Sequence, residues 1–243
     1  MKLVLEFATE KNKIPIEYRV AFMHFLKSCI NNANGGKYYD NYYEESKSKN
    51  FSFAIFFDNP KFREKEIELS SNRVKMLFTT SEELTGYIFY SSFLEKKHKR
   101  IILPDENSMV LRSIIKIKDP VVKNNKAIIK MNSPLVIRNH NKETNSDYYY
   151  SCSHRNFTEE ALKVIINQLK REGFRGEYLD GVQILPIKCR KVVIKHYDCF
   201  IEASVGIFIL EGNPAVLNYL IQAGIGSRKS EGFGMMELLT ENV

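Results

Sequence analysis

The order of the expected strands and helices repeats in the two halves of the chain, and this order limits the fold more than any single motif does. In outline, each half is expected to follow the order strand, helix, strands, second helix and last strand, as in a β-α-β-β-α-β unit. In the first half, periodicity predicts strands at 3–7, 51–57, 67–69, 74–78 and 110–117, a helix that enters at Pro15 and stops at Asn34, and a helix over 81–97. Segments 67–69 and 74–78 are expected to pair as a hairpin. The helix over 81–97 is expected to bury Leu84, Ile88, Phe89 and Phe93.

The second half follows the same order. Strands are predicted at 127–131, 182–187, 190–195 and 200–210, and helices are expected to start at Asn156 and Asn213. Asn156 and Glu159 are expected to form a capping box, and residues 139–146 are expected to form a polar loop. Two successive units of about 120 residues with this order predict an α+β fold of tandem ferredoxin-like, RNA-recognition-motif-like domains. Asp119-Pro120 marks the expected boundary, which divides the chain into domains 1–120 and 121–243.

The charge and the cysteines narrow the function classes that fit such a fold. The 243 residues carry a formal net charge of +7 with a pI of about 9.1, a balance that favours nucleic acid or an anionic membrane surface as partner. No apolar run approaches the roughly 20 residues that span a bilayer, so a membrane protein is not expected. The four cysteines have no Cys-x-x-Cys spacing and are expected to be reduced thiols of a cytoplasmic protein. We therefore expect neither a metal site nor a cofactor.

A glycine-rich segment near the C-terminus is the strongest functional signal. From Gly224 to Gly234 the chain has four glycines, with Arg228 and Lys229 at the centre. Glycine permits positive φ angles and a close approach of a ligand to the backbone. A run of main-chain N–H groups beside two cations therefore favours a phosphate-rich, extended partner. The segment is no P-loop, because Lys229 lacks the preceding glycine, and its place after a helix does not suit a dinucleotide fingerprint.

This segment resembles the C-terminal signature of the CRISPR repeat-processing endoribonucleases of the RAMP superfamily, which reads Gly-apolar-Gly, a short polar or basic stretch, then Gly-Phe-Gly-apolar. The resemblance covers nearly the whole chain and is strongest over 127–138, 148–169 and 206–237. It implies metal-independent cleavage of CRISPR precursor RNA within the repeats, which leaves 2′,3′-cyclic phosphate and 5′-hydroxyl ends. It also implies that the segment positions RNA through Gly224, Gly226, Ser227, Arg228, Lys229, Ser230, Gly232, Phe233 and Gly234.

Three residues are candidates for the chemistry that the resemblance implies. Family members commonly place a histidine after the first helix, and the matching position here is Tyr39. A tyrosine hydroxyl is a poor base near neutral pH, but it can hydrogen-bond to the sugar. Lys47 resembles the supporting lysine of the family, and His24 on the polar side of the first helix is a substitute base. The other four histidines are interpreted as structural or solvated: His98, His140, His154 and His196.

A second basic group lies on a predicted strand of the second half. Its members are Lys188, Arg190, Lys191 and Lys195. Alternation along the strand places Arg190 on one face and Lys191 and Lys195 on the other. The resemblance implies that such a surface grips RNA, while a solvated charged strand is the alternative interpretation.

Other functions remain open on the sequence alone. The missing histidine favours a non-cleaving homologue that binds repeat RNA. A structural RAMP subunit of a CRISPR effector complex would also have ferredoxin-like folds and glycine loops, although the near-symmetrical halves argue against it. A tandem RNA-recognition-motif module would carry Arg/Lys-Gly-Phe-x-Phe signatures, which this chain lacks. The expected partners are CRISPR repeat RNA, subunits of an effector complex and a second copy of the chain.

Overall fold

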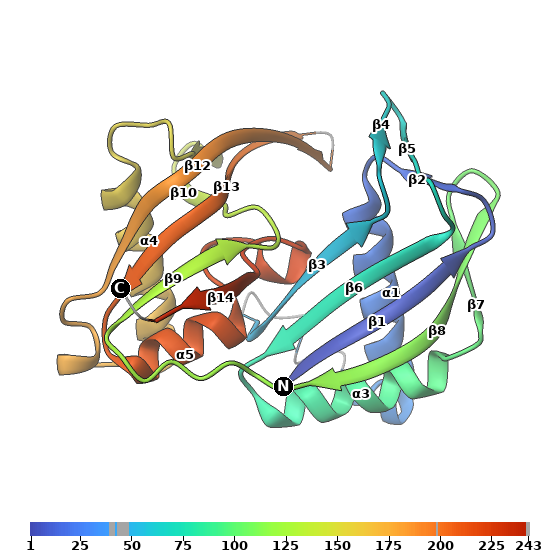
Figure 1. Ribbon diagram of the computed structural model, residues 1–243, viewed down its shortest axis with the longest axis horizontal. Coiled ribbons are helices and arrows are strands. Elements are labelled where there is room, and N and C mark those ends of the chain that lie inside the picture. The colour runs from blue at the N-terminus through green and yellow to red at the C-terminus, as the bar shows by residue number, and fades with distance from the viewer. Residues whose placement is uncertain (39–41, 43–48, 198, 242–243) are drawn as a thin grey trace.

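The chain forms two halves that lie side by side, each with a central antiparallel sheet (Figure 1). The computed structural model describes all residues except 39–41, 43–48, 198 and 242–243. The two halves have separate cores, one built from buried residues between Leu3 and Leu111 and the other from buried residues between Val122 and Met236. The positions of these two cores agree with a domain boundary at residue 120, which stays a prediction.

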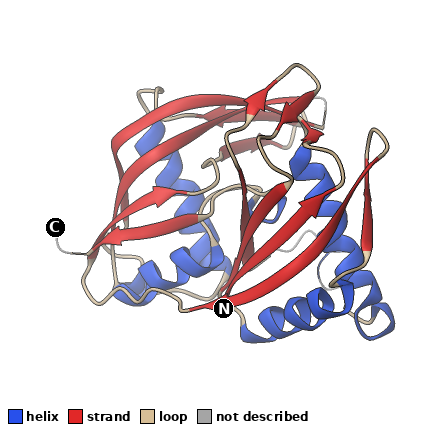
Figure 2. Cartoon of the chain, turned by 45° about the vertical axis from the view of Figure 1, so that its right-hand side comes forward, coloured by secondary structure: helices blue, strands red, loops and turns tan. Residues whose placement is uncertain are grey.

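The first half has a five-stranded sheet in the order β3-β6-β1-β8-β7. Its strands are β1 (Lys2–Thr9), β3 (Phe51–Phe57), β6 (Arg73–Thr80), β7 (Arg100–Leu103) and β8 (Asn107–Ile117). Helices α1 (Tyr18–Asn32) and α3 (Glu83–Lys96) cover one face of it (Figures 1 and 2). A separate small sheet contains β2 (Lys13–Pro15), β4 (Lys61–Phe62) and β5 (Glu66–Glu68). A short 3-10 helix, Ala33–Gly36, follows α1 and includes Asn34, where the helix was expected to stop.

The second half has a four-stranded sheet in the order β12-β13-β9-β14. Its strands are β9 (Lys126–Met131), β12 (Gln183–His196), β13 (Cys199–Glu211) and β14 (Met236–Thr240). Helices α4 (Phe157–Arg171) and α5 (Pro214–Ala223) pack on one face, and α5 begins at Asn213, whose side chain accepts a hydrogen bond from the N–H of Ala215. Strands β10 (Ile137–Asn141) and β11 (Ser146–Tyr150) form a separate hairpin, and a 3-10 turn lies at Gly176–Tyr178.

Both sheets have the same topology. In each half the unit strand–helix–strand–strand–helix–strand places its strands in the order second, third, first, fourth. This is the arrangement of the ferredoxin-like fold. The tandem ferredoxin-like prediction from the repeated order of elements is therefore confirmed.

Several local predictions are wrong. Strand β5 pairs with β2 and β4, while β6 pairs with β1 and β3, so segments 67–69 and 74–78 form no hairpin together. Leu84 is 57% exposed on α3, although Ile88, Phe89 and Phe93 are buried as expected. Segment 139–146 belongs to the β10–β11 hairpin and is not simply a loop. Asn156 makes no side-chain cap hydrogen bond.

Candidate nucleic-acid interface

The segment 224–234, called the glycine loop below, connects α5 to β14 and contacts both halves of the molecule. On the side of the first half, the Nε of Arg19 in α1 donates a hydrogen bond to the carbonyl of Gly232 at 3.2 Å. On the side of the second half, Gln168 of α4 donates to the carbonyl of Gly224 at 2.8 Å and accepts from the N–H of Gly226 at 3.1 Å. The loop therefore joins the two halves.

The glycines of the loop are required by close packing inside the protein. All four have positive φ angles. A Cβ on Gly224 would lie 2.7 Å from the side chain of Ser52, and one on Gly226 would lie 2.7 Å from the carbonyl oxygen of Val136. A Cβ on Gly232 would lie 2.8 Å from the ring of Phe53, and one on Gly234 would overlap the carbonyl oxygen of Ile225. These faces are closed by protein, so RNA does not approach the four glycines from the Cβ side.

Most main-chain N–H groups of the loop also have partners within the protein. The N–H groups of Ile225, Ser227 and Gly234 donate to the carbonyls of Gly234, Val136 and Pro134 respectively. Those of Glu231 and Gly232 close turns within the loop. These N–H groups hold the loop in place and are not free to donate to RNA, while the predicted role of the loop in positioning RNA stays a prediction.

Phe233 was also predicted to contact RNA, but its side chain is not accessible to solvent. Its side chain is fully buried and packs with Val136, Ile201 and Ala203. The guanidinium of Arg19 lies 4.9 Å from the centre of the Phe233 ring. Phe233 is therefore a packing residue between the two halves.

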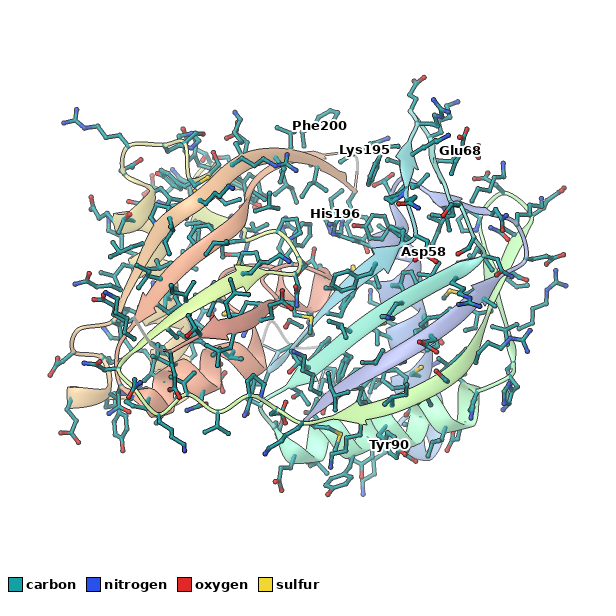
Figure 3. The ribbon with its side chains drawn as sticks, viewed as in Figure 1. Asp58, Glu68, Tyr90, Lys195, His196 and Phe200 are labelled. Carbon is teal, nitrogen blue, oxygen red and sulfur yellow. The ribbon has the colours of Figure 1, made fainter. Side chains whose placement is uncertain are left out.

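The centre of the loop carries a polar network that begins at His196. His196 lies between the two halves at the end of β12 (Figure 3), and its Nε2 lies 2.8 Å from Oε2 of Glu231. Arg228 donates to the same carboxylate at 2.9 Å. Burial opposes the ionisation of Glu231, but the hydrogen bond to His196 and the charge of Arg228 outweigh it and hold the pKa of Glu231 below its usual value.

Arg228 extends this network to the β10–β11 hairpin. It donates to the hydroxyl of Tyr149 at 3.1 Å and lies 3.5 Å from the carboxylate of Asp147. Asp147 also accepts from Arg138 at 3.1 Å. The charge of Arg228 is thus shared by two carboxylates, so this arginine anchors the loop to the hairpin.

A cavity of about 730 Å³ opens between the glycine loop, the β10–β11 hairpin and α4. The cations that line it are Lys49, Arg138, Lys142, Lys163, Arg171, Arg228 and Lys229, and the acidic residues that line it are Glu160 and Glu231. Lys142, Arg171 and Lys229 form no ion pair with any other described residue. Ser227 and Ser230 of the loop line the same cavity. Concave surfaces with such an excess of one charge concentrate the electric field and favour polyanions.

Lys229 is the most unusual cation of the cavity. Its side chain is only 6% exposed, and its Nζ has no hydrogen-bond partner among the described residues. Burial lowers its pKa to about 8, although the nearby charge of Glu172 opposes this shift. A buried ammonium without a partner is costly, and a phosphate is the kind of group that compensates it.

Comparison with known families agrees with this geometry. Residues 117–238 match the family model described as CRISPR associated protein Cas6, C-terminal. The chain belongs to the Cas6 family. Family membership indicates that the protein binds or processes CRISPR repeat RNA. No curated protein matches the chain significantly.

Solved structures of Cas6 and RAMP proteins share the fold over the whole chain. A Cas6-related protein from Pyrococcus furiosus has a TM-score of 0.85 at 18% identity, with 99% of each chain covered. A RAMP protein described as binding different RNA substrates has a TM-score of 0.84 at 19% identity, covering 99% of this chain and 100% of its own. A Cas6 product complex has a TM-score of 0.71 at 14% identity, with 98% and 99% covered. At these identities the likeness shows the tandem fold of Cas6.

Of the three predicted catalytic residues of this Cas6 protein, His24 lies within the part of the chain that the structure describes. Tyr39 and Lys47 lie outside the described residues. His24 is exposed on α1, as expected. It lies about 140° around the helix from Arg19, the residue that contacts the loop, because each helical residue adds about 100°. Tyr42, which follows the position of Tyr39 closely in sequence, packs on the first core and forms a hydrogen bond with Thr85.

The basic strand β12 is separate from the cavity. Lys188, Arg190, Lys191 and Lys195 are all exposed, and none of them lines the cavity at the loop. Lys191 forms an ion pair with Glu202 at 3.0 Å, and Lys195 lies 3.9 Å from Glu17. Their role in RNA binding stays a prediction.

Sequence analysis missed the residues that build the cavity around the loop. The main ones are Lys49, Gln168, Arg171, Lys142, His140 and Asp147. The spacing of His140 and Asp147 around a short polar stretch was the available signal, since it suits a hairpin. Gln168 had no such signal in the sequence. Its side-chain amide bonds to two glycines that lie 56 and 58 residues away, and this contact is visible only in three dimensions.

Among the described residues, no helix is both long and apolar enough to cross a bilayer.

Proposed function

We propose that the cavity beside the glycine loop binds CRISPR repeat RNA and that the protein cleaves the bound strand without a metal ion. The observation that carries this proposal is the buried ammonium of Lys229 in a cavity lined by seven basic side chains and two acidic ones. Lysine and arginine contacts to phosphate supply most of the affinity of a protein for nucleic acid. Single-stranded RNA carries a phosphate at every nucleotide, and these negative charges match the basic lining of the cavity.

The chemistry consists of attack by a ribose 2′-hydroxyl on the adjacent phosphorus. The 2′-oxygen forms a bond to phosphorus while its proton leaves to a base. The bond from phosphorus to the 5′-oxygen breaks, and that oxygen takes up a proton. The products are a 2′,3′-cyclic phosphate and a 5′-hydroxyl end. Lys229, placed beside the reacting phosphate, would stabilise the additional negative charge of the pentacoordinate phosphorus most strongly because it is desolvated.

A cleavage assay on the repeat RNA encoded next to the gene tests this proposal. Incubation in EDTA should give one cut per repeat, and the upstream product should resist labelling at its 3′ end until the cyclic phosphate is opened. An equal length of RNA with scrambled sequence is the control for general nuclease activity. A single 2′-deoxy substitution at the cut should abolish cleavage without weakening binding, because the nucleophile is then missing. Cleavage of that deoxy substrate would contradict the mechanism.

The second candidate function is repeat-RNA binding without cleavage. Tyr39 stands where the family commonly has histidine, and one of the similar structures is described as a RAMP protein that binds different RNA substrates. Tight binding of the repeat with no product in either EDTA or magnesium would favour this candidate. Association with effector-complex subunits or with a second copy of the chain stays a prediction.

A further inference from the structure

A histidine and an aspartate face each other across the β10–β11 hairpin at the edge of the cavity. His140 and Asp147 are directly paired in the strand register, and Nδ1 of His140 lies 2.8 Å from Oδ1 of Asp147. His140 lines the cavity together with Lys142 and Lys229. Directly opposite residues of an antiparallel pair have neighbouring Cβ atoms, so the hairpin itself sets this contact.

The pairing determines which ring nitrogen of His140 carries the proton. Burial opposes the ionisation of Asp147, but its hydrogen bond to His140 and the charge of Arg138 outweigh this and hold the pKa of the carboxyl below its usual value. An ionised carboxylate only accepts hydrogen bonds, so Nδ1 of His140 must be the donor. In the neutral imidazole, Nε2 is then the nitrogen with a free lone pair, and it has no hydrogen-bond partner among the described residues.

Asp147 is itself held in place by groups that belong to the loop and the hairpin. It accepts from Arg138 at 3.1 Å and from the hydroxyl of Tyr149 at 3.0 Å, and Arg228 of the glycine loop lies 3.5 Å away. A hydroxyl nucleophile is activated by a base whose orientation is fixed by a carboxylate. Here the carboxylate is itself held in place by further hydrogen-bond donors. The glycine loop thus connects to this pair through Arg228.

We propose that His140 is the general base of the RNA cleavage and that Asp147 is its positioning residue. This inference rests on the proposed function. Nε2 of His140 takes the proton of the attacking 2′-hydroxyl, the 2′-oxygen bonds to phosphorus, and the bond to the 5′-oxygen breaks as that oxygen gains a proton from water. The positive charge that forms on the imidazole is stabilised by Asp147. The protein therefore does not require a histidine after its first helix, because a different hairpin supplies one.

The other histidines are less suited to this role. All five histidines are within the described residues, and His140 is the one that lines the cavity. Nε2 of His196 is buried against Glu231. Nδ1 of His154 accepts from the main-chain N–H of Ser151. His24 and His98 are exposed on the first half, and neither lines the cavity.

Single-turnover cleavage of repeat RNA by full-length variants tests the proposal. His140→Ala should lower the cleavage rate by about 10² to 10⁴-fold, the range for loss of a general base, while the Kd for RNA changes by less than about threefold. Added imidazole should restore part of the rate of His140→Ala, because it occupies the space of the side chain. His140→Gln keeps a donor for Asp147 and should fold normally, yet it should be as slow as His140→Ala.

Asp147 and a control histidine make the test specific. Asp147→Asn should slow cleavage, and the double variant His140→Ala/Asp147→Asn should be no slower than His140→Ala alone, because the two residues act as a unit. His98→Asn, an exposed residue far from the cavity, should keep the rate of the natural chain. A His140→Ala variant that cuts within about threefold of the natural rate would overturn the base assignment and leave the proposed function intact. A natural chain that binds the repeat but never cuts it would overturn the base assignment together with the cleavage part of the proposed function.

Discussion

Two basic regions of the molecule differ in how their charges are arranged. On β12, Lys191 is exposed and paired with Glu202, and Lys195 is exposed and lies near Glu17. At the glycine loop, cations from α4, the β10–β11 hairpin, the loop and the segment before β3 converge on one cavity, and Lys229 among them is buried. The first region is a row of neighbours in sequence, while the second is assembled from distant segments.

This difference shows that clustering in sequence is a weak guide to a phosphate site. A cation on an exposed strand is surrounded by water and by its own ion-pair partner, so its interaction with a phosphate is screened. A cation inside a concave site acts at lower effective dielectric and adds to the field of its neighbours. We therefore expect the cavity to account for most of the RNA affinity and β12 for little of it.

The largest effect is expected from Gly234, since the loop holds the cavity together. Gly234→Ala should destabilise the protein by roughly 3 kcal/mol or more, because its Cβ would overlap the carbonyl oxygen of Ile225 and its φ of +69° is unfavourable for alanine. RNA binding should fall at least tenfold. Thermal unfolding and a filter-binding assay measure the two effects.

Gly181→Ala is the matched control for this prediction. Gly181 also has a positive φ, +66°, but a Cβ there would meet nothing within 4 Å. Its cost should be about 1 kcal/mol from backbone strain alone, and RNA affinity should not change. Equal destabilisation by the two substitutions would show that the close packing of the loop contributes nothing beyond the φ angle.

The fold was largely predictable because periodicity reports which side of each element is buried. The repeated order of elements predicted the tandem fold, and Asn213 was recognised as the start of α5. The predicted strands 182–187 and 190–195 are one strand, β12, and β14 was not among the predicted strands. The errors occurred where a distant partner decides the outcome. Segment 67–69 joins β2 instead of β6. Leu84 faces solvent although Ile88 and Phe89 of the same helix are buried.

The glycine loop illustrates the same limit at the site. Its glycines were noticed for their freedom to meet a ligand, yet Gly226 lies against the carbonyl of Val136 and Gly232 against the ring of Phe53. A short sequence pattern shows that the backbone is crowded without showing whether ligand or protein causes the crowding. His140 was missed for a related reason, because its partner Asp147 becomes a neighbour only when the hairpin forms.

The next largest effect concerns Lys229, which should influence stability and RNA binding in opposite directions. Lys229→Met should weaken RNA binding by about 10- to 100-fold, the range for a hydrogen bond between charged groups. It should also stabilise the protein without RNA by about 1 to 3 kcal/mol, because a buried charge is replaced by an apolar side chain. Lys163→Met, an exposed cation of the same cavity, is the control and should leave stability nearly unchanged.

The stability difference between Lys229→Met and the natural chain should depend on pH. The pKa of Lys229 is about 8 in the folded protein, and it is about 10.4 in an unfolded chain. Between pH 8 and about 10.4, Lys229 is protonated in the unfolded chain but largely deprotonated in the folded protein. The stability of the natural chain therefore increases with pH in this range. The advantage of Lys229→Met should be full at pH 7 and smaller at pH 9.5. A constant difference across this range, measured by urea unfolding, would contradict the buried ammonium.

A smaller effect is expected from Arg171, an exposed cation at the edge of the cavity. Arg171→Ala should lower RNA affinity about three- to tenfold at moderate salt, and it should reduce the slope of log Kd against log salt by about 0.7, the loss of one contact to single-stranded phosphate. Stability should not change, because the guanidinium forms no ion pair with the described residues. Binding titrations at several salt concentrations measure the slope.

The smallest effect is expected from Arg190, which matches Arg171 in residue type and in exposure but lies on β12. Arg190→Ala should change RNA affinity by less than about twofold and leave the salt slope unaltered, because a solvated side chain outside the cavity contributes only screened, long-range attraction. If instead Arg190→Ala reduced the slope as much as Arg171→Ala does, the RNA would extend across β12. The two basic regions would then form one continuous binding surface, and affinity would depend on the length of RNA bound as much as on the cavity.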